Sequence, residues 1–208
     1  MMQVALYLPV ILIGYLLGCS NLAWFLAKRK GVDIRGKGSG NPGASNAMIL
    51  MGWKAGVLVG LHDIGKAALA VWLGRTLFPA LPLAGELAGA ACVLGHLYPF
   101  YLRFRGGKGF AAYLGMVAVL NWRFALGLGL AILVLVLITD YMVVGTMTTV
   151  VSYPLYNLIT RHFLAAAVLA VISLFIVYKH RENFRRILNG TEIGLRRANR
   201  GELREKGN

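Results

Sequence analysis

The sequence predicts an all-α integral membrane protein, a bundle of about seven transmembrane helices. Two observations lead to this fold class. Hydrophobic residues make up 58% of the 208 residues and charged residues only 14%, whereas soluble domains carry about 25% charged residues. The apolar residues also form long runs rather than alternating stripes, and a run of about 20 residues is what crosses the hydrocarbon core of a bilayer.

Seven apolar runs follow one another along the chain, at 4–27, 53–74, 81–100, 110–120, 124–139, 141–160 and 162–178. Most approach the length of a spanning helix, whereas the run at 110–120 fits a half-span or a tilted, buried helix. Five or six spans are therefore the alternatives to seven. The first run has no basic segment before it and exceeds the length of a signal-peptide core, so we expect it to stay as a spanning helix.

Lysine and arginine predict the orientation of the bundle. They concentrate at 28–37, at 103–108 and from 179 onward, while the opposite loops hold only Arg75, Arg123 and Arg161. Because cytoplasmic loops carry the excess of positive charge, we expect the N-terminus outside and the C-terminus in the cytoplasm. Residues 1–192 are predicted to form a single membrane domain, and 193–208 a basic cytoplasmic tail.

The net charge of +14 lies mostly on this one predicted face. That distribution favours anionic membrane lipids and anionic ligands, and it argues against a nucleic-acid binder. The two cysteines, Cys19 and Cys92, both lie in apolar runs and form neither a disulfide framework nor a metal-binding pattern. We therefore expect no metal and no other cofactor.

A glycine-rich segment, GKGSGNPGASN at 36–46, separates the first two runs. Its four glycines and one proline exclude a helix. Ser39, Asn41 and Asn46 supply neutral donors, and glycine lets backbone N–H groups approach a ligand closely. A helix that begins near Ala44 adds the partial positive charge of its N-terminus. The segment is typical of an anion cradle, and a flexible connector is the alternative.

In the segment GHLYPFYLRFRGGKGFAA, at 95–112, the glycines at 106, 107 and 109 leave the backbone uncovered by side chains. Arg105 and Lys108 add positive charge directly before an expected helix. Backbone amides at Gly106 and Gly107, the N-terminus of the helix and the Lys108 ammonium all suit a phosphate. The spacing is not that of a Walker A motif. A positive-inside loop without a ligand is the alternative.

Two further segments carry polar side chains at the edge of, or inside, apolar runs. In YKHRENFRRILNGTE, at 178–192, His180 and Asn183 share one helix face where the last run ends. Contact of its arginines with anionic lipid is the alternative to a substrate site. Within the second run, His62, Asp63 and Lys66 place charge where it is costly. Asp63 and Lys66 either form a structural ion pair, or Lys66 binds a ligand.

GSGNPGASN, DIGKA, GHLYPFYLRFRGGKGFAA and HRENFRRILNGTE together resemble motifs of the bacterial acyl-phosphate:glycerol-3-phosphate acyltransferases (PlsY-type), across about residues 5–192. The resemblance implies a multi-pass enzyme of the bacterial inner membrane with its active site at the cytoplasmic face. Such an enzyme would transfer a fatty acyl group from acyl phosphate to the sn-1 hydroxyl of glycerol 3-phosphate, giving lysophosphatidic acid and phosphate. It would use neither acyl-CoA nor acyl carrier protein directly.

The resemblance also implies roles for the matched residues. The predicted catalytic residues are Ser39, Lys108, His180 and Asn183. The predicted substrate-binding residues are Gly40, Asn41, Asn46, Lys66, Gly106, Gly107 and Thr146. Asp63 and Glu192 are predicted to be structural. Either His180 or the leaving phosphate would take the proton from the attacking hydroxyl.

Three positions depart from the family pattern. Ile49 and Asp140 stand where the family usually has arginine, and Val143 stands where it has a serine, while Thr146 keeps a hydroxyl. The loss of one charge-assisted contact removes about 1.5–3 kcal/mol of binding free energy.

Three functions therefore remain open. The first is a working acyltransferase with altered affinity or a different acceptor. The second is a low-activity or inactive paralogue that binds or regulates lipid phosphates. The third is a small anion transporter that uses the charges inside the second run, although no inverted repeat is visible.

Overall fold

The computed structural model describes residues 5–192 and 194, and every regular element in these residues is helical. In chain order the elements are α2 (Leu8–Cys19), α3 (Leu22–Arg29), α4 (Ala44–Met51), α5 (Trp53–Leu77), α6 (Ala84–Leu97), the 3-10 helix η1 (Phe100–Leu102), α7 (Phe110–Leu120), α8 (Trp122–Thr139), α9 (Met142–Ile159), α10 (Phe163–Lys179) and α11 (Arg181–Leu188). All seven apolar runs of the sequence are therefore helical. Apart from Gly194, the predicted tail at 193–208 lies outside the described residues.

Four stretches of the described chain are long and apolar enough to cross a membrane: Leu8–Arg29, which joins α2 and α3, and helices α5, α8 and α9. Helices α10 and α11 form a fifth candidate that bends by 49°. With 14 and 11 residues, α6 and α7 extend about 21 and 17 Å, less than the ~30 Å hydrocarbon core. The chain is a multi-pass membrane protein, and seven crossings stay a prediction that depends on these two short helices.

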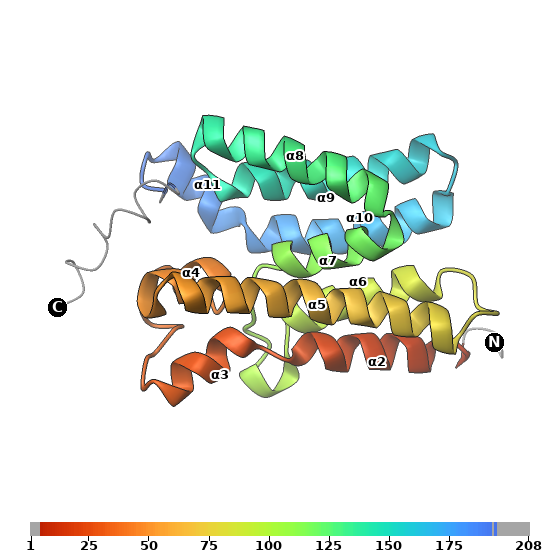
Figure 1. Cartoon of the computed structure of the whole chain (residues 1–208), viewed down its shortest axis with the longest axis horizontal. Helices are drawn as coiled ribbons and strands as arrows, with labels where there is room; N and C mark the ends of the chain where they lie inside the picture. Colours follow the sequence, from red (N-terminus) through yellow and green to blue (C-terminus); the bar gives the residue numbers. More distant parts are fainter. Residues whose placement is uncertain (1–4, 193, 195–208) are drawn as a thin grey trace.

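The helices lie roughly parallel in one bundle (Figure 1). Helices α2, α5 and α6 pack together on one side, α9 packs against α8 and α10 on the other, and α7 contacts α5, α6, α8 and α9 between them. Helices α3, α4 and α11 gather at the end opposite the start of α2. Basic residues from 35, 103–108 and 179–186 line one cavity there. The three basic segments do meet, and the side of the membrane that they face stays a prediction.

Close approach between α2 and α6 depends on small residues. A Cβ atom added to Gly18 would lie 2.0 Å from the carbonyl oxygen of Cys92, and one added to Gly14 would lie 2.2 Å from that of Ala88. Small residues of this kind let membrane helices pack backbone to backbone. Cys19 and Cys92 are both free and buried, as the sequence predicts.

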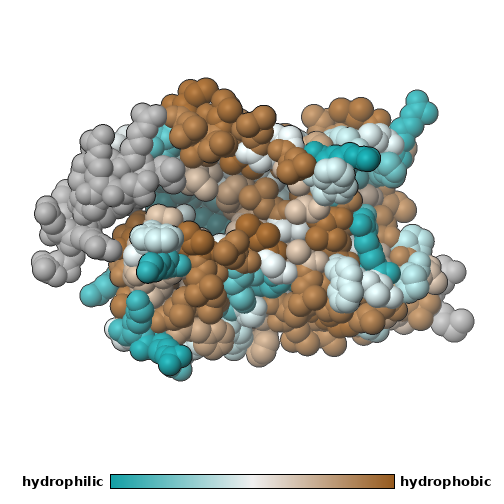
Figure 2. Space-filling view, in the orientation of Figure 1, coloured by the Kyte–Doolittle hydropathy of each residue, from teal (hydrophilic) through white to brown (hydrophobic). Residues whose placement is uncertain are grey.

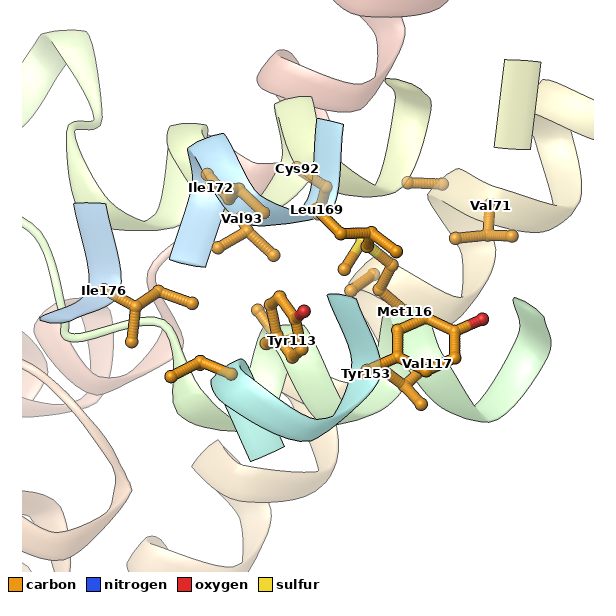
Figure 3. Packing of buried hydrophobic residues seen from close by; sticks show 14 of the residues in the cluster. Val71, Cys92, Val93, Tyr113, Met116, Val117, Tyr153, Leu169, Ile172 and Ile176 are labelled. Atoms are coloured by element: carbon orange, nitrogen blue, oxygen red, sulfur yellow. The ribbon is translucent and has the colours of Figure 1, made fainter. Parts of the chain in front are cut away.

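The largest group of buried apolar side chains surrounds α7 (Figure 3). Tyr113, Met116 and Val117 of α7 are fully buried, and they pack in this group with Leu169 and Ile176 of α10. The hydroxyl of Tyr113 also accepts a hydrogen bond of 3.3 Å from Ser173. This packing holds the N-terminal end of α7 in place, directly after the loop that carries Lys108.

The face of the bundle seen in Figure 2 is mostly hydrophobic, with hydrophilic residues set back in a hollow near the end where α4 and α11 lie. Helix α8 exposes one apolar residue after another, including Leu126, Leu130, Leu133 and Ile138. A helix that is apolar on its exposed face is typical of contact with lipid. The hollow is therefore the feature of this surface that calls for a functional explanation.

Candidate active site

Two cavities adjoin at the end of the bundle where α3, α4 and α11 gather. The larger has a volume of about 600 Å³ and is lined by seven cationic but only two acidic side chains. The smaller, of about 190 Å³, has a largely apolar wall and reaches His96 and His180. Ser39, Asn41, Lys108 and Arg186 line both cavities. Their junction suits a molecule, or a pair of molecules, with an anionic group on one side and an apolar group on the other.

Asn46 organises the glycine-rich loop rather than the cavities. It is fully buried, and its Oδ1 accepts a 2.8 Å hydrogen bond from the backbone N–H of Ser39. Its Nδ2 donates to the carbonyl oxygens of Ile34 at 2.8 Å and Lys37 at 3.1 Å. Asn46 lines neither cavity, whereas the predicted residues Ser39, Gly40 and Asn41 all do. The loop is therefore a fixed element that presents Ser39 and Asn41 to the cavities.

The loop before α7 is held against the end of α6. The N–H of Gly106 donates to the carbonyl of Leu97 at 3.0 Å, and that of Gly107 donates to the carbonyl of His96 at 3.1 Å. These two N–H groups therefore already have acceptors within the fold, while Gly106 also lines the larger cavity, and a substrate-binding role for Gly106 and Gly107 stays a prediction. A Cβ atom on Gly107 would lie 2.1 Å from His96 Nε2. Glycine is required because the loop lies directly on the His96 ring, and the loop's cationic contribution to the cavities comes from Lys108.

A chain of polar contacts links Lys108 to the C-terminal segment. The Lys108 ammonium donates to Asn183 Oδ1, and Asn183 Nδ2 donates to Glu192 Oε1. Arg186 Nε donates to the second oxygen of Glu192 at 2.6 Å. Glu192 therefore fixes both Asn183 and Arg186. This contact pattern gives a physical basis for the structural role predicted for Glu192.

Burial, and after it the nearby charge of Arg186, lower the pKa of the Lys108 ammonium to about 8, while Glu192 opposes this shift. At neutral pH the group is still mostly charged, but it has lost much of its hydration. A partly dehydrated cation gains more from an anionic ligand than a fully hydrated one. Lys108 therefore combines position and electrostatics for binding a phosphate.

His180 lies at the bend between α10 and α11 and is buried. Its Nδ1 lies 2.9 Å from the carbonyl oxygen of Ile176. A carbonyl can only accept, so Nδ1 carries the proton and Nε2 is left as an acceptor. Because His180 lines the smaller cavity, its acceptor nitrogen has the chemistry that a proton-accepting role needs.

Asp63, Lys66 and His96 form a buried polar cluster between α5 and α6. Lys66 Nζ lies 2.8 Å from Asp63 Oδ1, 2.9 Å from His96 Nδ1 and 2.7 Å from the carbonyl oxygen of Ser20. Asp63 and His96 line the smaller cavity, but Lys66 lines neither. Among the alternatives that the sequence leaves for Lys66, these contacts favour the structural ion pair. No group of three or more His, Cys, Asp or Glu side chains in the described residues is arranged to hold a metal.

Comparison with known proteins identifies the family. The family model described as "Glycerol-3-phosphate acyltransferase" matches residues 8–190. Glycerol-3-phosphate acyltransferase 1 of Oceanobacillus iheyensis is 36% identical over 91% of this chain and 95% of its own length. Glycerol-3-phosphate acyltransferase of Aliivibrio salmonicida is 41% identical over 90% and 96%. The chain belongs to the glycerol-3-phosphate acyltransferase family.

A solved member of this family has the same fold. The crystal structure of PlsY, an integral membrane glycerol 3-phosphate acyltransferase, in its glycerol 3-phosphate form superposes with a TM-score of 0.85 at 35% identity, covering 91% of this chain and 95% of PlsY. Its lysophosphatidic acid form superposes with a TM-score of 0.81 at 34% identity, covering 90% and 94%. The family resemblance of the sequence motifs is thus confirmed at the level of the whole chain.

The departures from the acyltransferase pattern concentrate on the wall of the smaller cavity. Ile49 of α4 and Val143 of α9 both line it, together with Met48 and Met142. Thr146 also lines it, and its hydroxyl donates to the carbonyl of Met142 at 3.2 Å. The wall is therefore more apolar in this chain than the family pattern predicts. Asp140 lines neither cavity and lies beside Gly194 at the end of α8.

The structure thus brings together Ser39, Lys108, His180 and Asn183, which come from three separate segments. Sequence reasoning missed two residues that line this candidate site. His96 lies within the quoted motif GHLYPF, and Arg186 lies three residues after Asn183. The i, i+3 spacing from Asn183 was a usable signal for Arg186. Nothing in the sequence places the His96 ring beneath Gly107.

Proposed function

We propose that this acyltransferase transfers a fatty acyl group from acyl phosphate to the sn-1 hydroxyl of glycerol 3-phosphate. The products are lysophosphatidic acid and inorganic phosphate. The observation that carries the proposal is the junction of a basic cavity with an apolar one at Lys108, with His180 in the apolar one. Both substrates are phosphates and one has a long apolar chain, so the pair of cavities matches them in charge and in polarity.

The larger cavity supplies the charge that the reaction requires. Two phosphate groups must lie near each other, and at ~6 Å with an effective dielectric constant of ~20 each pair of unit charges repels by about 3 kcal/mol. Seven cationic side chains line this cavity, with only Asp33 and Glu182 opposing them. Their field offsets the repulsion, so that positioning rather than covalent chemistry becomes the main contribution of the protein.

In the chemical step, the sn-1 oxygen forms a bond to the acyl carbonyl carbon and the bond from that carbon to the phosphate oxygen breaks. His180 Nε2 accepts the hydroxyl proton and passes it to the departing phosphate, or the phosphate takes the proton directly. Lys108 and Arg186 stabilise the phosphate charge. Asn183, oriented by Lys108 and Glu192, stays aligned with both substrates. Atoms and charge balance without a cofactor.

The smaller cavity and its apolar wall are assigned to the acyl chain near its carbonyl end. Met48, Ile49, Met142 and Val143 form the wall. We place the enzyme in the bacterial inner membrane with the two cavities at the cytoplasmic face, where soluble glycerol 3-phosphate is available. The concentration of lysine and arginine at this end supports that orientation and favours contact with anionic lipids.

A low-activity paralogue that binds or regulates lipid phosphates is the second candidate, and Ile49 is the observation that favours it. An isoleucine in the cavity wall cannot bind phosphate, and one missing charge-assisted contact weakens binding by about ten- to a hundredfold. Lys108, His180 and Asn183 are all present in the cavities, which favours the active enzyme.

The experiment measures phosphate release by purified protein in detergent with palmitoyl phosphate, with and without glycerol 3-phosphate. The unmodified protein, Ile49→Arg and Lys108→Ala are compared, and Lys30→Ala is the control because Lys30 is exposed and lines neither cavity. Acceptor-dependent release that Lys108→Ala abolishes is expected. Phosphate release by Ile49→Arg but not by the unmodified protein identifies the inactive paralogue. No release by either of these two proteins contradicts the proposed reaction.

A further inference from the structure

His96 is a buried polar side chain of the smaller cavity to which the proposed reaction gives no role. It lies at the end of α6, is 4% exposed and lines the cavity together with His180 and Lys108. Its Nδ1 is occupied within the Asp63–Lys66–His96 cluster, while no described residue accepts a hydrogen bond from its Nε2. An imidazole nitrogen at the wall of a cavity that no described protein group satisfies is available to a ligand.

The contacts of Lys66 determine which nitrogen of His96 carries the proton. An ammonium group has three N–H donors and no acceptor. Lys66 Nζ has three neighbours within hydrogen-bond distance: Asp63 Oδ1 at 2.8 Å, the Ser20 carbonyl oxygen at 2.7 Å and His96 Nδ1 at 2.9 Å. His96 Nδ1 must therefore accept. A neutral ring with an accepting Nδ1 carries its proton on Nε2.

Asp63 does not change this assignment. Its Oδ1 lies 3.3 Å from His96 Nδ1, which is longer than the 2.9 Å from Lys66, and a proton on Nδ1 would point at the Lys66 ammonium. The ring is also fixed from the other side, because Gly107 lies directly against it and donates to the His96 carbonyl. Both the tautomer and the orientation of the ring are thus set before any ligand binds.

We propose that His96 Nε2–H is a hydrogen-bond donor to the acyl carbonyl oxygen in the smaller cavity, with Lys66 as the positioning residue that maintains this tautomer. This inference rests on the proposed acyl transfer. A neutral donor suits a carbonyl oxygen that gains negative charge only as the acceptor hydroxyl adds to it. The cations Lys108 and Arg186 suit the phosphates, which are charged throughout.

Two matched substitutions separate the donor from the packing. In His96→Asn, the side-chain oxygen can replace Nδ1 as the acceptor for Lys66, but no donor reaches the position of Nε2. In His96→Gln, the longer side chain places an N–H near that position. We expect kcat to fall about 10²- to 10³-fold in His96→Asn, the loss typical of one removed oxyanion donor, with a much smaller loss in His96→Gln. KM for glycerol 3-phosphate should be unchanged in both.

Unaltered kcat in His96→Asn, or equal losses in the two variants, would overturn the proposal, because packing alone would then explain the residue. A loss confined to KM would also overturn it, since that indicates a ground-state contact. Thermal unfolding in detergent checks that each variant is folded.

A second measurement does not require activity. Nitrogen-15 NMR of histidine-labelled protein should show one ring with an unprotonated Nδ1 and a protonated Nε2, and this signal should be absent from His96→Asn and altered in Lys66→Met. A protonated Nδ1 on His96 overturns the proposal. If the unmodified protein shows this tautomer but no acceptor-dependent phosphate release, the proposed reaction fails while the assignment of the His96 donor proton stands.

Discussion

Gly107→Ala tests the link between the buried Asp63–Lys66–His96 cluster and the loop that carries Lys108. The added Cβ would lie 2.1 Å from His96 Nε2 and 2.8 Å from its Cε1. Ordinary contact begins at 3.4 Å, so the loop and the ring must separate by about 1 Å. The ring cannot easily yield, because Lys66 binds its Nδ1 and Leu97, the next residue, is fully buried. We therefore expect the loop to move and to carry Lys108 with it.

The expected magnitude follows from this displacement. Overpacking of a buried site costs about 1–3 kcal/mol of stability, and a ~1 Å misplacement of a substrate-positioning group costs about 10²-fold in rate. We expect kcat/KM for glycerol 3-phosphate to fall about 10²-fold in an assay of phosphate release, with a modest fall in the melting temperature.

Gly129→Ala is the matched control, because a Cβ on Gly129 of α8 meets no atom within 4 Å. It should leave both activity and melting temperature unchanged. Activity of Gly107→Ala equal to that of the unmodified protein would refute the reasoning, as would equal losses in the two variants. Either result would mean that the loop does not depend on its contact with His96.

Three other predictions follow from the same contacts. Binding of glycerol 3-phosphate, measured by calorimetry from pH 6.5 to 9.5, should weaken as pH rises through about 8, because unliganded Lys108 loses its proton there. Above that pH, binding should be accompanied by uptake of a proton. In Lys108→Arg, the loss of affinity with rising pH and the proton uptake should both disappear. Glu192→Gln should lower the unfolding free energy by about 1.5 kcal/mol through its weakened bond to the partly exposed Arg186, and unchanged thermal unfolding would contradict this. Asn46→Ala should lower stability by about 1–3 kcal/mol because it leaves the Ser39 amide without its acceptor; a loss of activity at full stability would instead favour direct substrate contact.

The sequence predicted the helical fold class and the residues of separate motifs that line the cavities, because both depend on local patterns. Long apolar runs become helices wherever they are placed, and all seven did so. Ser39, Lys108, His180 and Asn183 lie in separate motifs, and positive charge at the end of several runs indicated that these motifs share one end of the bundle. The number of crossings was harder to predict, since α6 and α7, with 14 and 11 residues, are shorter than a helix that crosses the hydrocarbon core.

Residue roles that depend on tertiary hydrogen-bond partners could not be predicted from the sequence in the same way. Asn46 has the composition of a phosphate ligand, yet its amide is used up by three backbone groups of its own loop. The amides of Gly106 and Gly107 are occupied by carbonyls of α6. In each case a donor that looks available in the sequence is satisfied in the fold, because buried backbone groups must find partners.

The sequence by itself determined that this is a helical membrane protein with a basic, glycine-rich end and the motifs of an acyltransferase. Only the tertiary structure decided that Lys66 lines neither cavity, that its three protons have partners within the bundle, and that His96 lines the smaller cavity with Gly107 against its ring. Composition and spacing describe one helix at a time. The protonation of a ring is set by atoms of Ser20 after α2, of α5 and of α6, which meet only when the helices pack.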